Sequence, residues 1–436
     1  MMQAGFTGLS PCCKRSVIFA SHSRAYDLYC SGQWLVTDAT LSRITLVTET
    51  FAPEVNGVAN TLNHLVQGML QRGIEVQVIR PRQFAGDNPR IDDQLHTVTL
   101  PGLPIPGYQG LKFGLPLKGR ISQAIADFQP QAIYVATEGP MGWAAVKAAT
   151  QLGIPVLSGF HTNFHQYIQH YRLGWLEQLA YRYLRYFHNL TSGTLVPTRM
   201  QRDELEQQGF HNVRVLSRGV DSQLFAPHKR RDELRKQWGV KEDDLVLLYV
   251  GRIAGEKNMP LALATYQQLL NTDERVQLVL VGDGPELERI QEQFPRVICC
   301  GMQRGEALAS HYASGDVFLF PSKTDTFGNV VTEAMASGLA VVSFDYAAGH
   351  EHIRSGENGM LAAFADDPEF IRQASTLLDS PNLLRRLRHN ARQTAEGIAW
   401  SSIVDEFISR LNSAQTEVSQ HGNGKTNVRK SSAPVS

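Results

Sequence analysis

The stretch PSKTDTFGNVVTEAMASG, residues 321–338, decides the fold that we expect for this chain. Four apolar residues before it, 317–320, predict a short buried strand. The loop that follows contains Asp325. Beyond the loop, apolar residues recur at helical spacing until Gly338, and glycine is typical just past the C-terminus of a helix. A strand, a loop and a helix in this order form the crossover unit of a parallel α/β sheet.

The same stretch predicts a site for an anion with acidic neighbours. The first backbone amides of a helix have no partner within it, and the helix dipole favours negative charge there. Asp325 lies in the loop, and Glu333 lies about one and a half turns into the helix. Carboxylates repel phosphate but accept hydrogen bonds from sugar hydroxyls, so the expected ligand carries both groups. The alternative is an ordinary crossover with surface acids, which is common in α/β proteins.

Length and composition exclude several classes of protein. A chain of 436 residues exceeds one typical core and predicts two domains. Lys plus Arg and Asp plus Glu both number 42, and this balance argues against a dedicated nucleic-acid binder. The five cysteines show no zinc spacing, and their odd number indicates a reducing compartment. No apolar run approaches the roughly 20 residues that span a bilayer, and no secretory signal is present.

The first half of the chain offers two candidate site residues, each in a segment that follows an apolar run. Residues 44–49 predict a buried strand, residues 58–72 a helix and residues 74–79 the next strand, with Gly57 at the helix start. No G-x-G-x-x-G follows the first strand, so a nicotinamide or flavin site is not expected. A later strand, 154–158, places His161 just beyond its C-terminal end, where ligands of doubly wound sheets bind.

Two cations follow one strand of the second half of the chain. Residues 245–250 predict a buried strand, and Arg252 and Lys257 come directly after it. Like charges repel unless an anion lies between them, and a diphosphate would supply one. The pair therefore predicts a second set of phosphate contacts.

In this order and spacing, these residues resemble family-4 glycosyltransferases, which are retaining enzymes of GT-B architecture. The donor motif of that family has two acidic residues that flank seven others, and here they are Asp325 and Glu333. The first acid is shorter than the usual Glu. The resemblance covers roughly residues 44–411 and implies an α/β fold with two Rossmann-like domains that face each other across a cleft.

The expected domain boundaries follow from this resemblance and from the alternation of strands and helices. Residues 43–220 form an N-terminal Rossmann-like acceptor domain, and residues 221–397 form a C-terminal nucleotide-sugar donor domain. Residues 213–221 resemble the link between the two, and residues 398–413 cross back onto the first domain. We expect an irregular or disordered extension at 1–42, with a transit peptide as the alternative, and a disordered tail at 414–436.

By resemblance, the reaction transfers a hexose from a nucleoside diphosphate sugar to a hydroxyl and keeps the anomeric configuration. GDP-mannose and UDP-glucose are the candidate donors, and a lipid or a saccharide is the acceptor. The resemblance implies no metal and no cofactor. The implied catalytic residues are His161, Arg252, Lys257 and Asp325. The implied donor-binding residues are Gly57, Arg252, Lys257, Met302, Asp325, Phe327, Gly328, Asn329, Val330 and Glu333.

Three alternatives remain open from the sequence. A sugar-nucleotide epimerase of the same architecture would use acids of the first domain, for which Glu49, Glu54 and Glu138 are candidates. A non-catalytic nucleotide-sugar binding protein is supported only by the short Asp325. The third alternative concerns two segments, the apolar loop at 100–119 and the aromatic, basic helix at 171–188, which either pack on the protein or contact a membrane. We expect a cytoplasmic protein, with peripheral association at the inner membrane face as an option.

Overall fold

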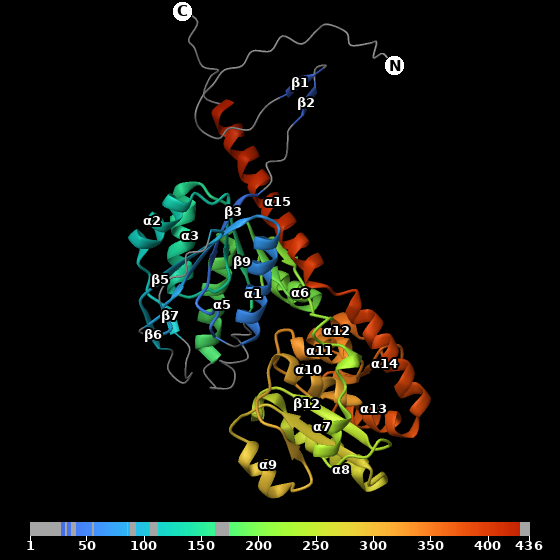
Figure 1. Ribbon diagram of the computed structural model, residues 1–436. Helices are drawn as coiled ribbons and strands as arrows, with labels where there is room; N and C mark the ends of the chain where they lie inside the picture. The colour runs from blue at the N-terminus through green and yellow to red at the C-terminus, as the bar shows by residue number, and fades with distance from the viewer. Residues whose placement is uncertain are drawn as a thin grey trace, which may run out of the picture. The chain divides into compact units, whose positions relative to one another are not determined.

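The computed structural model describes residues 28–30, 33–35, 41–54, 56–84, 86–87, 93–104, 112–161 and 174–427 (Figure 1). Residues 1–40 are a unit separate from residues 41–436. In the first unit, β1 (Leu28–Cys30) pairs with β2 (Gln33–Leu35) in antiparallel fashion. The rest of the predicted extension up to residue 40 lies outside the described residues.

The first sheet of the larger unit has seven parallel strands in the order β11-β10-β9-β8-β3-β4-β5. Its strands are nearly continuous apolar runs because helices cover both faces of a parallel sheet. The strands are β3 (Arg43–Val47), β4 (Glu75–Pro81), β5 (Leu95–Leu100), β8 (Ala132–Val135), β9 (Val156–Gly159), β10 (Gly193–Val196) and β11 (Val213–Val215).

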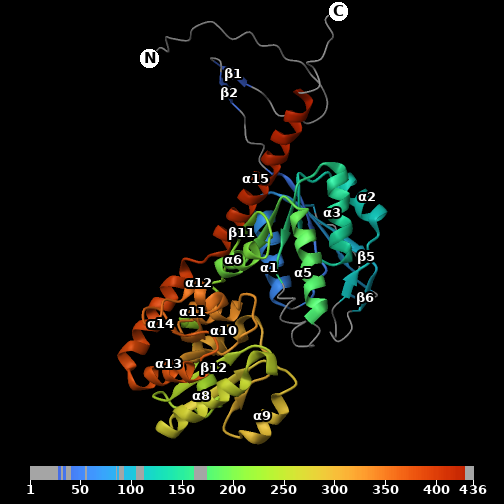
Figure 2. The same ribbon diagram turned by 180° about the vertical axis from the view of Figure 1, so that it is seen from behind.

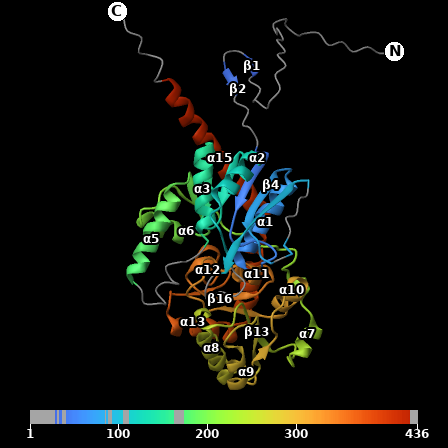
Figure 3. The ribbon, with the colours of Figure 1, turned by 90° about the vertical axis from the view of Figure 1, so that its left-hand side faces the viewer.

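The helices of this domain are α1 (Gly57–Gln71), α2 (Lys118–Phe128), α3 (Pro140–Leu152), α5 (Gly174–Asn189) and α6 (Arg199–Gln207). Figure 3 shows α5 at one edge of the domain. In the loop predicted at 100–119, β6 (Gly102–Pro104) and β7 (Lys112–Gly114) pair in antiparallel fashion, and residues 105–111 lie outside the described residues.

The second sheet has six parallel strands in the order β14-β13-β12-β15-β16-β17. They are β12 (Leu245–Val250), β13 (Val276–Val281), β14 (Ile298–Cys299), β15 (Val317–Phe320), β16 (Ala340–Phe344) and β17 (Met360–Ala362). The helical segments are η1 (Pro227–Lys229), α7 (Asp232–Gln237), η2 (Gly255–Lys257), α8 (Met259–Thr272), α9 (Leu287–Gln293), α10 (Gly305–Ser314), α11 (Asn329–Ala336), α12 (Ala347–His352), α13 (Asp367–Asp379) and α14 (Pro381–Glu396).

The strand order reverses once in each sheet, between β3 and β8 in the first and between β12 and β15 in the second. The loops beyond the C-terminal ends of such strands diverge and leave a crevice for ligands. The motif at 321–338 follows β15, and Arg252 follows β12. Both therefore lie at the crevice of the second sheet, as the sequence predicts.

The final helix, α15 (Trp400–Asn427), returns from the second domain to the first, as Figures 1 and 2 show from opposite sides. Phe407, Leu411 and Ala414 of this helix are buried in the core of the first domain. The prediction of a disordered tail from residue 414 is corrected here, because α15 continues to Asn427. Ala414 has a place in the core, and the polar residues after it include no proline that would interrupt the helical hydrogen bonds.

Candidate active site

A cavity of about 1030 Å³ lies between the two domains. This volume is enough for a nucleotide sugar, since small-molecule sites usually enclose several hundred Å³. Both domains and the link between them line the cavity. Six of the predicted donor-binding residues line it, namely Gly57, Arg252, Met302, Asn329, Val330 and Glu333.

The first turn of α11 offers unpaired backbone amides to this cavity. Gly328 precedes the helix with φ of 90°, and no side chain caps the helix start. A Cβ atom at Gly328 would lie 2.7 Å from the ring of Phe320, so both conformation and space require glycine. Asn329 and Val330 therefore present their amides where an anion can bind.

Glu333 provides an acidic group in the same cavity. Its carboxyl group accepts a 2.9 Å hydrogen bond from the hydroxyl of Tyr312. Burial raises the pKa of Glu333 to about 7, although the hydrogen bond from Tyr312 opposes that shift. A ligand that donates hydroxyl hydrogens to Glu333 would favour its carboxylate form.

The two predicted phosphate-binding cations each have a carboxylate partner. Arg252, with a side chain that is 62% exposed, pairs with Glu256 at 3.0 Å. Nζ of Lys257 lies 2.7 Å from Oδ1 of Asp325. Acids of the chain itself thus pair with both cations, so the repulsion between Arg252 and Lys257 does not by itself require an anion between them. Their role in donor binding stays a prediction.

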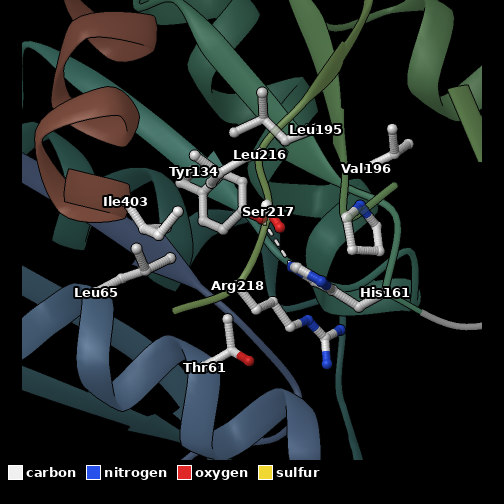
Figure 4. Close-up of a pocket in the computed structure, with 11 residues that line it drawn as sticks. Thr61, Leu65, Tyr134, His161, Leu195, Val196, Leu216, Ser217, Arg218 and Ile403 are labelled. Atoms are coloured by element: carbon white, nitrogen blue, oxygen red, sulfur yellow. Dashed lines mark hydrogen bonds between the residues drawn. The ribbon is translucent and has the colours of Figure 1, made fainter. Parts of the chain in front are cut away.

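His161 lies at a second, much smaller cavity, which Figure 4 shows. Its Nε2 atom shares a 2.7 Å hydrogen bond with the hydroxyl of Tyr134, and its Nδ1 atom has no partner among the described residues. Burial, together with the charges of Arg218 and His188, lowers the pKa of His161 to about 3. The imidazole is thus neutral at physiological pH.

Besides His161, four predicted site residues do not line the large cavity. Lys257 and Asp325 pair with each other beside it, and Gly328 lies behind the start of α11. Phe327 is only 1% exposed and belongs to the core of the second domain.

Two family profiles match the chain, and together they cover most of both domains. Residues 55–224 match the profile described as Glycosyltransferase Family 4, and residues 230–394 match Glycosyl transferases group 1. A GDP-mannose-dependent alpha-mannosyltransferase of Corynebacterium glutamicum is 32% identical over 87% of this chain and 88% of its own length. The chain belongs to glycosyltransferase family 4.

Further relatives and solved structures agree with this assignment. A GDP-mannose-dependent alpha-mannosyltransferase of Mycobacterium tuberculosis is 30% identical over 84% of this chain and 95% of its own length. The Anabaena protein Alr3699/HepE, solved in complex with UDP, superimposes with a TM-score of 0.68 at 18% identity, over 85% of this chain and 100% of its own. That likeness shows the fold, which is the GT-B arrangement of two Rossmann-like domains.

The structure adds site residues of this family-4 glycosyltransferase that the sequence did not single out. Arg218, in the link after β11, lies in the small cavity beside His161. The turn at 282–285, which the sequence explained by turn geometry alone, lines the large cavity. A Cβ atom at Gly282, which has φ of 141°, would collide with the carbonyl oxygen of Gly251. The sequence offered one signal for Arg218, which is that an arginine stands directly before a glycine in the link between the domains.

The three acids considered for an epimerase have other contacts in this glycosyltransferase. Glu138 pairs with buried His188 at 3.2 Å. Glu54 lines the large cavity and accepts hydrogen bonds from the side chains of Thr50 and Asn56. Glu49 lies against the start of α3, where burial raises its pKa to about 7. The epimerase and the non-catalytic binding protein are not favoured, since the relatives are named as transferases.

Proposed function

We propose that this enzyme transfers a hexose from a nucleoside diphosphate sugar to a hydroxyl group of a lipid or saccharide, with retention of the anomeric configuration and without a metal ion. One observation carries the proposal: a single cavity contains the uncapped N-terminus of α11, Arg252 and the carboxyl group of Glu333. These are complementary to phosphate and to ribose hydroxyls, the two parts that every such donor shares.

GDP-mannose is the donor that we favour over UDP-glucose. Three relatives at 30% to 32% identity, each aligned over at least 84% of this chain, are named GDP-mannose-dependent alpha-mannosyltransferase. An alpha-monoglucosyldiacylglycerol synthase of Streptococcus pneumoniae is less similar, at 27% over 69% of the chain. The name of the streptococcal relative supports a lipid as the acceptor.

The chemistry that we propose rests on stabilising the leaving diphosphate. The bond between the sugar C1 atom and the phosphate oxygen breaks, and a bond from C1 to the acceptor oxygen forms on the same face. Arg252, Lys257 and the amides of α11 offset the charge that develops on the diphosphate, as preorganised dipoles and cations do in other enzymes. The acceptor proton passes to an oxygen of the leaving phosphate, so no side chain is needed as a general base.

The roles of Asp325 and His161 are to hold the sugar. Asp325 is paired with Lys257, so we propose that the pair acts as one unit, with Lys257 toward the diphosphate and Asp325 toward the sugar hydroxyls. His161 offers a neutral Nδ1 atom from the other domain.

The experiment that tests this proposal measures donor binding and turnover of the purified enzyme in the presence of EDTA. We expect a thermal shift with GDP and GDP-mannose but a smaller one with UDP and UDP-glucose, since a ligand at 100 times its Kd adds roughly 2.7 kcal/mol of stability. Arg252→Met and Glu333→Gln should reduce the shift, and Arg275→Gln, on the surface of the same domain, should not. Loss of turnover in EDTA that Mg²⁺ restores would overturn the metal-free mechanism, and absence of any shift would overturn the donor site.

We also propose peripheral contact with an anionic membrane through α5. The side chains of Leu179, Tyr183 and Tyr186 are 41% to 56% exposed on this helix, while Arg182 and Arg185 beside them are exposed too. Apolar side chains with flanking cations are typical of interfacial helices. In the described part of the chain, no helix has both the length and the apolar character needed to cross a bilayer.

Sedimentation with vesicles that contain anionic lipid tests the membrane proposal. We expect the wild-type enzyme to bind such vesicles, and we expect Leu179→Glu/Tyr186→Glu to bind several-fold more weakly. Leu152→Glu changes an exposed leucine at the far end of α3 and is the matched control. Equal binding of all three proteins would show that α5 does not contact the membrane.

A further inference from the structure

Arg218 is a buried cation that lacks a carboxylate partner among the described residues. Its side chain is only 5% exposed, and no described ion pair includes it. Its guanidinium donates one long hydrogen bond, of 3.4 Å, to Oδ1 of Asn329, and its Nε atom has no partner. Arg252 and Lys257 differ, because each has an acid within 3.0 Å.

A charge in this position is costly unless a ligand offsets it. Burying a cation without an anion costs several kcal/mol, and the protein removes the cost only by neutralising the group or by binding an anion. Burial lowers the pKa of Arg218 to about 10, so the side chain remains a cation at neutral pH. Asp325 opposes this shift from a distance, but no carboxylate among the described residues forms an ion pair with Arg218.

The surroundings of Arg218 point to phosphate. A Cβ atom at Gly57 would lie 3.8 Å from Nη1 of Arg218 and 3.9 Å from Nδ2 of Asn329, so these three residues meet at one point. Gly57 begins α1 and Asn329 begins α11, so two helix N-termini from different domains converge there. Both helix dipoles and the guanidinium favour an anion at the same place.

The neighbours of Arg218 indicate which of the two donor phosphates it would bind. Arg218 shares the small cavity of Figure 4 with His161, the residue predicted to contact the sugar. Its guanidinium lies over the ring of Phe327, 5.4 Å from the ring centre. Phe327 is two residues away from Asp325 in the sequence, and Asp325 is predicted to contact the sugar. Glu333, predicted to bind ribose, lies more than a turn further along α11.

We propose that Arg218 is a third cation of the donor site and that it binds the phosphate that carries the sugar. This inference rests on the proposed function. Through the planar fork of its guanidinium, Arg218 contacts two oxygens of that phosphate, and it stabilises the charge that the phosphate gains when the bond to the sugar breaks.

The first test compares the stability of unliganded variants. Removing an unpaired buried charge relieves its desolvation cost, so Arg218→Met should melt at or above the wild-type Tm. Arg392→Met is the contrasting control, because Arg392 donates hydrogen bonds to the carbonyl oxygens of Ser222, Phe225 and Ala336 and its loss should lower the Tm. A fall in the Tm of Arg218→Met as large as that of Arg392→Met would mean that Arg218 only supports the fold.

The second test measures the affinities of the wild type and Arg218→Met for GDP and GMP by calorimetry, with UDP and UMP as a parallel series. Because the contact is to the terminal phosphate, the affinity for the diphosphate should fall about 10- to 100-fold, as for loss of a charge-assisted hydrogen bond. The affinity for the monophosphate should stay within about twofold. A structural disturbance would weaken both nucleotides equally, and unchanged affinity for the diphosphate would overturn the inference.

The controls separate this inference from the proposed function. If the wild type binds no nucleoside diphosphate, the proposed function fails whatever Arg218 does. If the wild type binds and turns over donor while Arg218→Met does so equally well, only the assignment of Arg218 fails. Should Arg218→Met not fold, the same comparison with Arg218→Lys decides, because a point charge on a shorter stem should weaken diphosphate binding alone.

Discussion

At the scale of single residues, two carboxyl groups link the stability of this enzyme to pH. Burial raises the pKa values of Glu49 and Glu333 to about 7. Between about pH 4.5 and 7 the folded protein therefore binds more protons at these groups than the unfolded chain does. By linkage, their contribution to the free energy of unfolding is greatest below that window and falls as the pH rises through it.

We therefore expect Glu49→Gln and Glu333→Gln each to stabilise the protein above pH 7. The gain is about 1–3 kcal/mol at pH 8, because the neutral amide avoids the burial of a carboxylate, and it should vanish near pH 4. The Tm measured between pH 4 and 8 checks this, with exposed Glu288→Gln as the control. Parallel Tm curves for the wild type and both variants would contradict the prediction.

At the scale of elements, the contact between α1 and α15 depends on one glycine. Gly68 lies on the buried face of α1, and a Cβ atom there would collide with Cγ2 of Val404 and lie 2.9 Å from Cγ1. The close approach lets α15 pack Phe407 and Leu411 into the core of the first domain. A small residue at this position thus fixes the distance between two helices that lie far apart in the sequence.

Gly68→Ala should therefore destabilise the enzyme by about 1–3 kcal/mol, as overpacking does, although alanine favours a helix over glycine by about 1 kcal/mol. Val404→Ala removes the methyl groups that clash. In the double variant most of the loss should be recovered, and urea unfolding of the four proteins in the cycle measures the coupling. Strictly additive effects would show that the two side chains do not meet.

At the scale of the whole enzyme, the two crossings of the chain between the domains lie against each other. The amide of Val220 donates a 2.9 Å hydrogen bond to the carbonyl oxygen of Ile398. A Cβ atom at Gly219 would lie 2.7 Å from the backbone of Trp400, so the crossings touch without a side chain between them. Arg218 directly precedes Gly219, so the geometry of this link helps to place Arg218 at the small cavity beside His161.

Gly219→Ala should force the crossings apart and shift one domain against the other. We expect kcat/KM to fall about 10-fold or more, since misplacing groups of a site by an ångström can cost that much. The affinity for the nucleotide should change less, because Met302 and Glu333 belong to one domain. Gly397→Ala, at a nearby position with an ordinary φ of −77°, is the control. A larger effect on nucleotide affinity than on turnover would contradict this view.

The sequence by itself determined the succession of strands and helices and the placement of several site residues. Apolar runs and glycine positions are local signals, so the strand at 317–320, the start of α11 and the position of His161 after β9 could be predicted from them. The length of α15 could not, because Ala414 is buried in a core to which Leu62, Leu65 and Val66 of α1 contribute from far away in the sequence.

Only the tertiary structure decided how charges are paired in the crevice. Lys257 and Asp325 are 68 residues apart, and Arg218 and Asn329 are 111 residues apart, yet each pair is in contact. No local pattern encodes such contacts, because they arise when two sheets and a link converge in space. For the same physical reason, the sequence pointed to Arg252 and Lys257, which form ion pairs, and passed over Arg218, which forms none with the described residues.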